Sequence, residues 1–381
     1  MDLYLDYNAT VPPHPEVREV MDAAARERWG NPQSVHAWGR RARAVVEDAR
    51  EQVAALVGCA PRQVTFTSGA TEANNTVLKG RALAEPDATI LVGAGEHSSV
   101  RVPARYLREL GFDTAEIPVD GDGLVAPAAL ERALRQHAPV SLVSVMWANN
   151  ETGTLQPIAE LAAVCAEHGV PLHSDAVQAA GKVPVDWGAG VAALSLSAHK
   201  LGGPQGVGAL VRDDEVLALD PLLHGGGHER DRRAGTENVA GIAGFGRAAE
   251  LARRDREAHA AHTRALRNRL EARLSGGPAG AEAVSAGAER LPNTSCLLLP
   301  GVAAETLLMR LDLEGIAVSS GSACASGGLQ PSAPLLAMGY DRAQAASAIR
   351  VSLGAATTAD ETERFAGRLE ALAEQLRQRP A

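Results

Sequence analysis

The amino-acid sequence predicts an α/β fold with two domains. Strand-like and helix-like patterns alternate through residues 16–255, which is typical of helices that flank a mostly parallel sheet. A long helix pattern rich in Ala, Arg, Glu and Leu covers residues 244–273. The chain of 381 residues is also long for one hydrophobic core. We therefore expect a large domain at residues 16–255 and a smaller α+β domain formed by residues 1–15 and 256–381.

The individual elements follow from short apolar runs and from helical periodicity. Residues 89–92, 140–145 and 208–211 are apolar runs of strand length and are predicted to be strands. Residues 244–273 are expected to form the helix that connects the two domains, and residues 358–377 have the pattern of one amphipathic helix.

Composition and charge narrow the functional class. Hydrophobic residues make up 45% of the chain and charged residues 22%, as in ordinary soluble globular proteins. Aromatic residues are only 3%, so the core must depend on Leu, Val and Ala. The net charge of −9 argues against nucleic acid as a direct partner. The absence of a signal peptide, a transit peptide and a long apolar span predicts a cytoplasmic protein that does not bind membranes.

Lys200 is the first candidate catalytic residue. It comes directly after a small, apolar run that is typical of a buried strand. A buried lysine is costly unless its amine is neutral or covalently used, and desolvation lowers the pKa of a lysine. A neutral amine forms a Schiff base with a carbonyl group, which points to an enzyme that uses pyridoxal phosphate (PLP). In the alternative interpretation Lys200 ends a strand and reaches water, so the prediction depends on partner residues.

Asp175 is the first such partner. It follows an apolar run at residues 170–172, at the carboxyl end of a predicted strand, where open α/β sheets bind their ligands. PLP is an electron sink only while its ring nitrogen is protonated, and a buried aspartate maintains that state. Gln178 is placed to reach the ring's phenolic oxygen. Alone, Asp175 would be interpreted as a helix cap or turn residue, but a lysine about 25 residues later favours the cofactor site.

The cofactor's phosphate needs an anion-binding site, and residues 64–75 have the pattern of one. They form a predicted strand, a glycine turn and a helix, whose N-terminus offers free backbone N–H groups and a favourable dipole. A simple helix cap by Ser68 or Thr71 is the alternative, and both interpretations can hold. Ser197 and His199, which flank the candidate lysine, are further candidate phosphate ligands. The turn residues are Ser68, Gly69, Ala70 and Thr71.

Among the four cysteines, Cys324 is the candidate nucleophile. Its surroundings at residues 319–328 are small, polar and rich in glycine, which predicts an exposed, mobile loop. Beside a PLP site, a thiol in such a loop is favoured as a nucleophile over a tolerated surface thiol. Cys165 and Cys296 lie in apolar patterns and are expected to be inert, and Cys59 has no assigned role. The cysteines are far apart and form no CxxC pair, so no zinc site is expected, and a reducing cytoplasm predicts that no disulfides form.

These motifs carry a resemblance to a known family over nearly the whole chain. The sequence resembles the cysteine desulfurases of the NifS/IscS class, which are fold-type I PLP enzymes of the class V aminotransferase family. Each motif is short, but their joint occurrence in this order is highly specific. The matching segments are 4–10 (YLDYNAT), 30–34 (GNPQS), 67–72 (TSGATE), 96–97 (EH), 149–153 (NNETG), 175–178 (DAVQ), 197–200 (SAHK), 224–229 (HGGGHE), 233–236 (RAGT), 319–324 (SSGSAC) and 349–354 (IRVSLG).

The resemblance implies a fold and a reaction. The fold is aminotransferase-like, with a mostly parallel, seven-stranded sheet in the large domain and the catalytic cysteine loop in the small one. The reaction removes sulfur from L-cysteine, giving L-alanine and a persulfide on Cys324. The sulfur then passes to an acceptor protein for iron–sulfur cluster biosynthesis, tRNA thiolation or other sulfur pathways. The resemblance also implies a homodimer, and the long cysteine loop resembles the NifS/IscS-like rather than the SufS-like subgroup.

Roles for individual residues are implied in the same way. Lys200 would bind PLP and act on the substrate's α-proton, Arg350 would bind the substrate carboxylate, and Asn150 would contact both cofactor and substrate. His97 would stack on the ring and move protons, and Thr236 would complete the phosphate site of the partner subunit. No metal is expected. The expected catalytic residues are Cys324, Lys200 and His97. The expected cofactor-binding residues are Ala70, Thr71, His97, Asn150, Asp175, Gln178, Ser197, His199, Lys200 and Thr236.

Three alternatives were weighed against this prediction. Selenocysteine lyase, or another PLP enzyme of the class V aminotransferase family, would share the fold and the lysine, and the sequence does not separate selenocysteine lyase from a desulfurase. A non-catalytic sulfur carrier is disfavoured by the joint presence of the candidate lysine, aspartate, histidine and cysteine. A P-loop or Rossmann enzyme is excluded because neither glycine fingerprint occurs.

Overall fold

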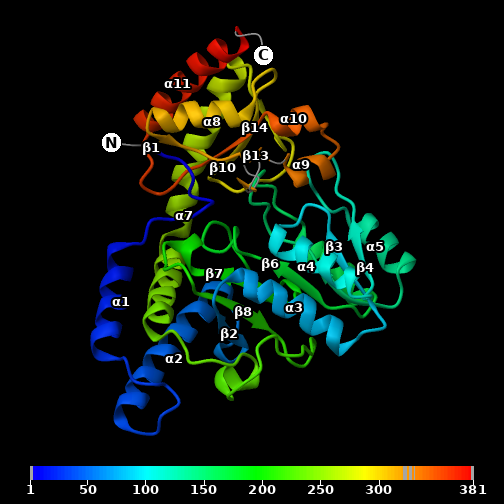
Figure 1. Ribbon diagram of the computed structural model, residues 1–381, viewed down its shortest axis with the longest axis vertical. Coiled ribbons are helices and arrows are strands. Elements are labelled where there is room, and N and C mark those ends of the chain that lie inside the picture. The colour runs from blue at the N-terminus through cyan, green and yellow to red at the C-terminus, as the bar shows by residue number, and fades with distance from the viewer. Residues whose placement is uncertain (1–2, 321–323, 326–327, 330, 379–381) are drawn as a thin grey trace.

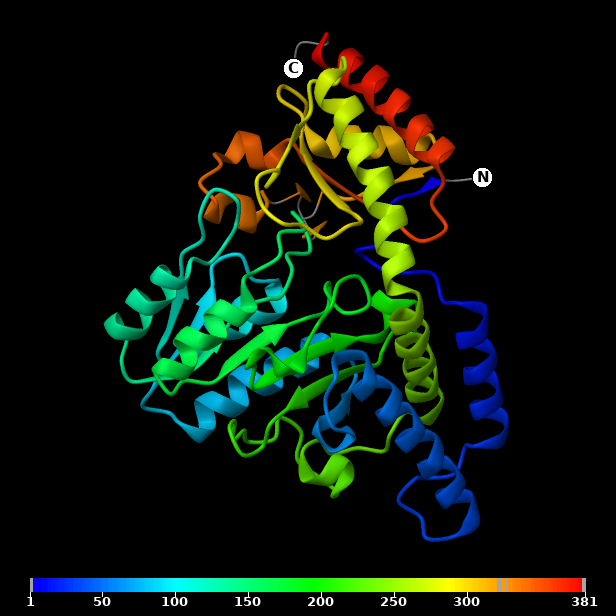
Figure 2. The same cartoon turned by 180° about the vertical axis from the view of Figure 1, so that it is seen from behind.

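The computed structural model of the chain describes residues 3–320, 324–325, 328–329 and 331–378 (Figure 1). For residues 324–325 and 328–329 the backbone alone is described. A central sheet with helices on both sides forms the larger part, and a smaller group of strands and helices lies at one end of it. Helix α7 (Val239–Gly276) runs through both parts, as the two opposite views show (Figures 1 and 2).

The central sheet has seven strands and is mostly parallel, as predicted. Strand β8 is antiparallel to both of its neighbours, and the other adjacent strands are parallel. Every strand of this sheet except β4 corresponds to a run that was predicted to be a strand. The spatial order is β2 (Val64–Thr67), β8 (Gly208–Arg212), β7 (Ala193–Ser197), β6 (Leu172–Asp175), β5 (Val140–Ser144), β3 (Thr89–Gly93) and β4 (Thr114–Ile117).

Helices cover both faces of this sheet because its strands are apolar on both sides. In β3, Ile90 and Val92 pack into one buried cluster and Leu91 into the other, since alternate side chains of a strand point to opposite faces. One face is covered by α3 (Ala70–Ala84) and α4 (Ser98–Glu109). The other is covered by α2 (Ala37–Val57), α5 (Pro127–Gln136), α6 (Ile158–Glu167) and the first part of α7.

Helix α1 (Pro15–Glu27) lies outside α7 and packs against it through Val17. Short 3-10 turns occur between the main elements. They are η1 (Pro61–Gln63), η2 (Trp187–Ala189), η3 (Ala198–Leu201) and η4 (His228–Asp231).

The smaller part is an α+β arrangement with its own core. Leucine and alanine side chains dominate that core, with Phe365 as its buried aromatic residue. Its main sheet pairs β10 (Thr294–Leu298) antiparallel with β14 (Ala348–Ser352) and β9 (Glu282–Ala283). The other elements are β1 (Leu3–Tyr4), β11 (Ile316–Ala317), β12 (Cys324–Ala325), β13 (Gly328–Leu329), α8 (Ala304–Leu313), α9 (Ala333–Ala337), α10 (Arg342–Ala346) and α11 (Ala359–Arg377).

Both ends of the chain meet in this smaller part. Strand β1 pairs parallel with β11, and Asp6 bridges to Ser352 at the end of β14. The predicted C-terminal helix is α11, which begins with a capping box between Thr358 and Glu361.

Helix α7 is the predicted connecting helix. Its first part places Ile242 and Phe245 in the core beneath the large sheet, and its last part places Leu266 and Leu270 in the smaller core. The boundaries proposed from the sequence, 16–255 and 1–15 with 256–381, stay a prediction. Although α7 has 38 residues, no helix in the described part of the chain is apolar over a length that would cross a bilayer.

Candidate active site

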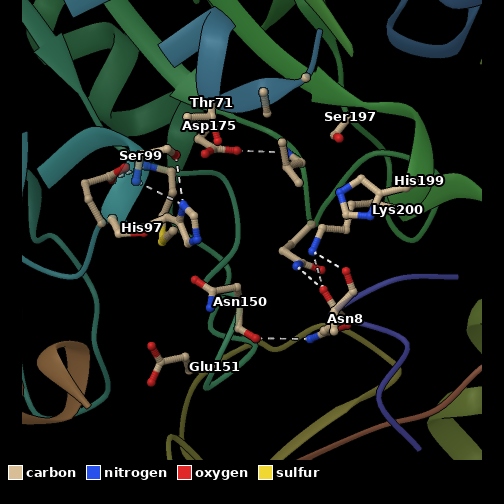
Figure 3. A pocket seen from close by; sticks show the side chains of 18 of the residues that line it. Asn8, Thr71, His97, Ser99, Asn150, Glu151, Asp175, Ser197, His199 and Lys200 are labelled. Atoms are coloured by element: carbon tan, nitrogen blue, oxygen red, sulfur yellow. Dashed lines mark hydrogen bonds between the residues drawn. The ribbon is translucent and has the colours of Figure 1, made fainter. Parts of the chain in front are cut away.

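A cavity of about 880 Å³ lies at the carboxyl ends of the parallel strands, beneath the smaller part. Open α/β sheets bind ligands at this edge, and the volume is typical of small-molecule sites. His97 follows β3, Asp175 ends β6, and Lys200 lies just after β7, so each side chain enters from a different strand. The labelled side chains surround one open space in Figure 3. We call it the sheet-edge cavity.

Lys200 lies in the 3-10 turn η3, directly after β7. Its amine donates hydrogen bonds to the backbone carbonyls of Asn8, at 2.5 Å, and Ala9, at 2.9 Å. Burial, with the positive charge of Arg350 nearby, lowers the pKa of Lys200 to about 8, although Asp175 and Asp6 oppose this shift. A substantial fraction of the amine is therefore neutral near physiological pH, as a carbonyl-binding lysine requires.

Asp175 is buried at the end of β6 and is fixed by two hydrogen bonds. Its Oδ1 accepts the backbone N–H of Val177 at 3.0 Å, and its Oδ2 accepts the amide of Asn74 at 2.8 Å. The Asn74 amide also donates to the hydroxyl of Ser99 at 2.8 Å, and that hydroxyl lies 2.8 Å from Nδ1 of His97. A continuous chain of hydrogen bonds therefore connects Asp175 with His97.

His97 is the N-cap residue of α4 and lines the cavity. Its Nδ1 accepts the backbone N–H of Ser99 at 3.1 Å, so the ring proton of the neutral form lies on Nε2. Burial lowers the pKa of His97 below its ordinary value. The ring is therefore neutral near pH 7, with a donor Nε2–H.

The N-terminus of α3 lies at the turn that the sequence predicts to bind an anion. Its N-cap residue is Gly69, and no side chain caps the helix, so the cap by Ser68 or Thr71 that was the alternative does not form. The free backbone N–H groups lie at the cavity, where they favour an anion. Glycine at position 208 is needed beside this turn, because a Cβ there would lie 2.6 Å from the Cα of Gly69.

Gln178 and His199 also line the cavity but already have partners on the N-terminal segment. The Gln178 amide donates to the backbone carbonyl of Asn8 at 3.0 Å. Nδ1 of His199 lies 3.2 Å from the hydroxyl of Thr10. Burial, with the charge of Lys200, lowers the pKa of His199 to about 4, so its ring is neutral.

Arg350 on β14 lines the opposite side of the cavity. Its guanidinium donates to the Asp6 carboxylate at 2.7 Å and to the backbone carbonyl of Asn150 at 3.0 Å. Its Nε is buried and has no hydrogen-bond partner among the described residues. The side chain of Asn150 itself projects into the open space (Figure 3). These two contacts use two of the five N–H groups of the guanidinium, so donors remain for a ligand in the cavity that Arg350 lines.

The structure gathers twelve of the residues quoted for the predicted site around this one cavity. Thr236 is not among them and is exposed on the subunit described here. The backbone of Cys324 lies in β12, but its side chain falls outside the described residues. The twelve that line the cavity are Ser68, Gly69, Ala70, Thr71, His97, Asn150, Asp175, Gln178, Ser197, His199, Lys200 and Arg350.

The three cysteines whose side chains are described differ from the exposed, reactive thiol that is predicted for Cys324. Burial raises the pKa of each thiol, in Cys59, Cys165 and Cys296, to about 12. These thiols therefore remain protonated and poorly nucleophilic near neutral pH.

Sequence reasoning missed four polar residues that organise the cavity, Asn8, Asn74, Ser99 and Lys182. Asn74 and Ser99 connect Asp175 with His97, as described above. Asn8 is almost completely buried and receives hydrogen bonds from both Lys200 and Lys182. Asn8 and Asn74 lie inside or beside motifs noticed in the sequence, but their partners are far away in the chain, so the motifs gave no sign of these contacts.

Comparison with known proteins agrees with this geometry. The model of the family described as aminotransferase class-V matches residues 3–365. The chain belongs to the class-V aminotransferase family. The family predicted from the sequence is therefore confirmed.

Relatives that the chain matches over nearly its whole length are named cysteine desulfurases. The chain is 45% identical over 362 residues to an IscS-like cysteine desulfurase of Mycobacterium tuberculosis, covering 92% of this chain and 91% of the relative. It is 41% identical over 388 residues to cysteine desulfurase IscS of Dictyoglomus turgidum, covering 99% and 95%. Among solved structures, a NifS-like protein superposes with a TM-score of 0.91 at 37% identity, covering 98% of this chain and all of that one.

A further solved relative bears on the substrate. The structure described as SspA in complex with cysteine superposes with a TM-score of 0.81 at 30% identity, covering 93% of this chain and 100% of that chain.

Proposed function

We propose that this class-V aminotransferase family member is a PLP-dependent cysteine desulfurase. It converts L-cysteine and the thiol of Cys324 into L-alanine and a Cys324 persulfide. The names of its near full-length relatives support this activity, and the relative solved with cysteine supports the substrate.

The residues around the sheet-edge cavity fit PLP. The uncapped N-terminus of α3 lies at the cavity and offers N–H groups to a phosphate. Asp175 presents a buried carboxylate to a ring nitrogen, and Lys200 has an amine with a lowered pKa for the aldehyde. Ser197, His199 and Gln178 would complete the contacts.

When bound, PLP supplies an electron sink for negative charge that develops on the substrate amino acid. The protein's own residues orient that substrate. The Arg350 guanidinium, which lines the cavity, would bind the carboxylate, and Asp6 holds the guanidinium in place. Lys200 Nζ would take up the α-proton, since its pKa of about 8 allows the amine to gain and lose a proton near neutrality.

His97 would donate through its Nε2–H. The Asp175–Asn74–Ser99 chain of hydrogen bonds holds the ring in the tautomer that places this proton on the cavity side. Sγ of Cys324 would then attack the substrate's sulfur. The carbon–sulfur bond breaks and a sulfur–sulfur bond forms. The β-carbon gains a proton and becomes the methyl group of alanine.

The finer assembly is also part of the proposal. We expect a cytoplasmic homodimer in which Thr236 contributes to the partner subunit's phosphate site, and a sulfur-acceptor protein that receives the persulfide sulfur. The exposure of Thr236 supports its availability to a second subunit. Trp29 and Trp38, which stack on each other with 66% and 46% of their surfaces exposed, support a contact surface nearby.

The observation that carries the proposal is the position of the Lys200 amine, partly desolvated in the same cavity as Asp175 and Arg350. The test is a pair of substitutions in purified protein loaded with PLP. Cys324→Ala should abolish alanine formation while keeping the visible absorbance band. Lys200→Ala should abolish both, because that band requires the covalent bond to the lysine.

Two outcomes would contradict the proposal. One is undiminished alanine formation by Cys324→Ala, which indicates a different PLP reaction. The other is a wild-type protein that remains colourless after PLP is added. Cys59→Ala is the matched control, and it should retain both the band and the activity because burial keeps its thiol protonated.

A further inference from the structure

A second lysine lies behind Lys200 and has no place in the proposed reaction. Lys182 donates from Nζ to Oε1 of Gln178 at 2.6 Å and to Oδ1 of Asn8 at 3.0 Å. The charged groups that act on it are Lys200 and Arg350, which are both positive. Burial and these two charges lower the pKa of Lys182 well below its ordinary value. Keeping an amine in this position is costly, so the contact with Gln178 needs an explanation.

The contacts fix which end of the Gln178 amide faces which neighbour. A lysine amine has donors in this pairing, so the Gln178 atom at 2.6 Å must be the oxygen. The backbone carbonyl of Asn8 accepts only, so its partner in Gln178 must be the nitrogen. One N–H of that nitrogen is used on Asn8, and the second is available in the sheet-edge cavity that Gln178 lines.

We propose that Lys182 is a positioning residue that holds the Gln178 amide with its nitrogen, rather than its oxygen, toward the phenolic oxygen of the bound cofactor. This inference rests on the proposed function, since the phenolic oxygen belongs to PLP. A donor at that position stabilises negative charge on the oxygen, whereas an amide oxygen there would repel it.

The orientation has a measurable consequence in the loaded protein. A donor to the phenolic oxygen stabilises the negative charge on that oxygen. The charge then attracts the proton on the nitrogen of the cofactor–Lys200 linkage less strongly, so the pKa of that nitrogen is lower. Removing the donor therefore raises the pH midpoint of the cofactor's visible absorbance. One neutral hydrogen bond corresponds to a rise of about 0.5 to 1 pH unit.

The experiment is a double-mutant cycle read by absorbance against pH. Lys182→Met and Gln178→Met should each raise the midpoint by about 0.5 to 1 pH unit. Lys182→Met should add nothing further when Gln178 is already Met, because Lys182 acts through that amide. An equal rise in both backgrounds would show an effect of charge through space and would overturn the proposal. An unchanged midpoint in either single variant would also overturn it.

Two further variants complete the test. Lys182→Arg keeps donors for the same oxygen, and a second cavity of about 550 Å³ beside Lys182 leaves room for the longer side chain, so the wild-type midpoint should be retained. Lys79→Met, on α3 beside Tyr106, is the matched control and should not shift the midpoint.

Failure of folding and failure of the proposed function are separable from failure of this inference. Melting temperatures report whether each variant folds. If Lys182→Met does not fold, Lys182→Arg decides, and a midpoint raised as far as in Gln178→Met overturns the proposal. If the wild-type protein shows no visible band, the proposed function is wrong and the inference is wrong with it.

Discussion

At the scale of single residues, the site depends on where lysine is used in place of arginine. The sequence contains three lysines, Lys79, Lys182 and Lys200, among 37 basic residues. Two of the three place their amines at or behind the sheet-edge cavity. Burial away from water lowers the pKa of a lysine amine enough to make it neutral, whereas a guanidinium keeps its charge. Only lysine can therefore supply the neutral nucleophile that the proposed reaction requires.

The lowered pKa of Lys200 predicts how its reactivity depends on pH. The protonated amine is unreactive, and the neutral, reactive fraction grows as the pH rises through about 8. In protein free of PLP, acylation of Lys200 should therefore rise with a midpoint near pH 8, measured by peptide mass spectrometry. Replacing Arg350 with Gln should move the midpoint upward, because the Arg350 charge helps to lower this pKa.

A Lys200 midpoint near 10.5, the ordinary value for a lysine, would contradict this account. Lys79 is modified in the same sample and controls for the effect of pH on the reagent itself. Its amine lies over the ring of Tyr106, away from the cavity.

The type of a residue and its place in the sequence pattern predicted only some of the residues of the site. Lys200 and Asp175 could be predicted because a charged residue directly after a buried strand is unusual and needs a reason. Asn74 could not, because an asparagine inside a helix has many ordinary roles. Its partner Asp175 lies 101 residues away, and only the folded chain brings the two side chains to 2.8 Å.

At the scale of elements, the strands and helices that place the site were predicted from their patterns. Apolar runs predicted every strand of the large sheet except β4, and helical periodicity predicted α7 and α11. The pattern of a run does not state its direction in a sheet, so the antiparallel placement of β8 was not foreseen. That placement matters, because it brings Gly208 against the turn that begins α3.

This contact predicts the effect of a single methyl group. In Gly208→Ala the new Cβ would lie 2.6 Å from the Cα of Gly69, which forces the start of α3 to move. The N–H groups offered to the cofactor's phosphate move with it. We expect the dissociation constant for PLP to rise about tenfold or more, a loss of about 1.4 kcal/mol, measured by titration of the visible band.

Gly276→Ala, at the end of α7, is the matched control because its Cβ would meet nothing within 4 Å. It should leave PLP affinity unchanged. An affinity retained in Gly208→Ala would show that the α3 turn does not hold the phosphate.

At the scale of the whole molecule, Asn8 joins the parts that form the cavity. Its backbone carbonyl accepts from Lys200 and Gln178 of the larger part, and its side chain bonds to Thr294 and Asn293 of the smaller part. The site therefore depends on how the N-terminal segment lies between the two. The sequence placed residues 1–15 with the C-terminal part, but it gave no sign of this junction, because contacts over nearly 300 residues leave no local pattern.

The family, the fold class and the desulfurase activity all follow from several short motifs taken together. No single motif sufficed, since the anion-binding turn, the aspartate and the lysine each had an ordinary structural alternative. The cavity supports the combined interpretation, because it gathers those three motifs on one edge of the sheet. The roles of Cys324 and Thr236 stay predictions.

The most direct test of the central claim is the location of the sulfur after one reaction with L-cysteine. Mass spectrometry of PLP-loaded protein should find one additional sulfur atom on the peptide that contains Cys324, together with free alanine, and neither in Lys200→Ala. Alanine formed with no sulfur on that peptide, or with the sulfur on Cys59, Cys165 or Cys296 instead, would contradict the account.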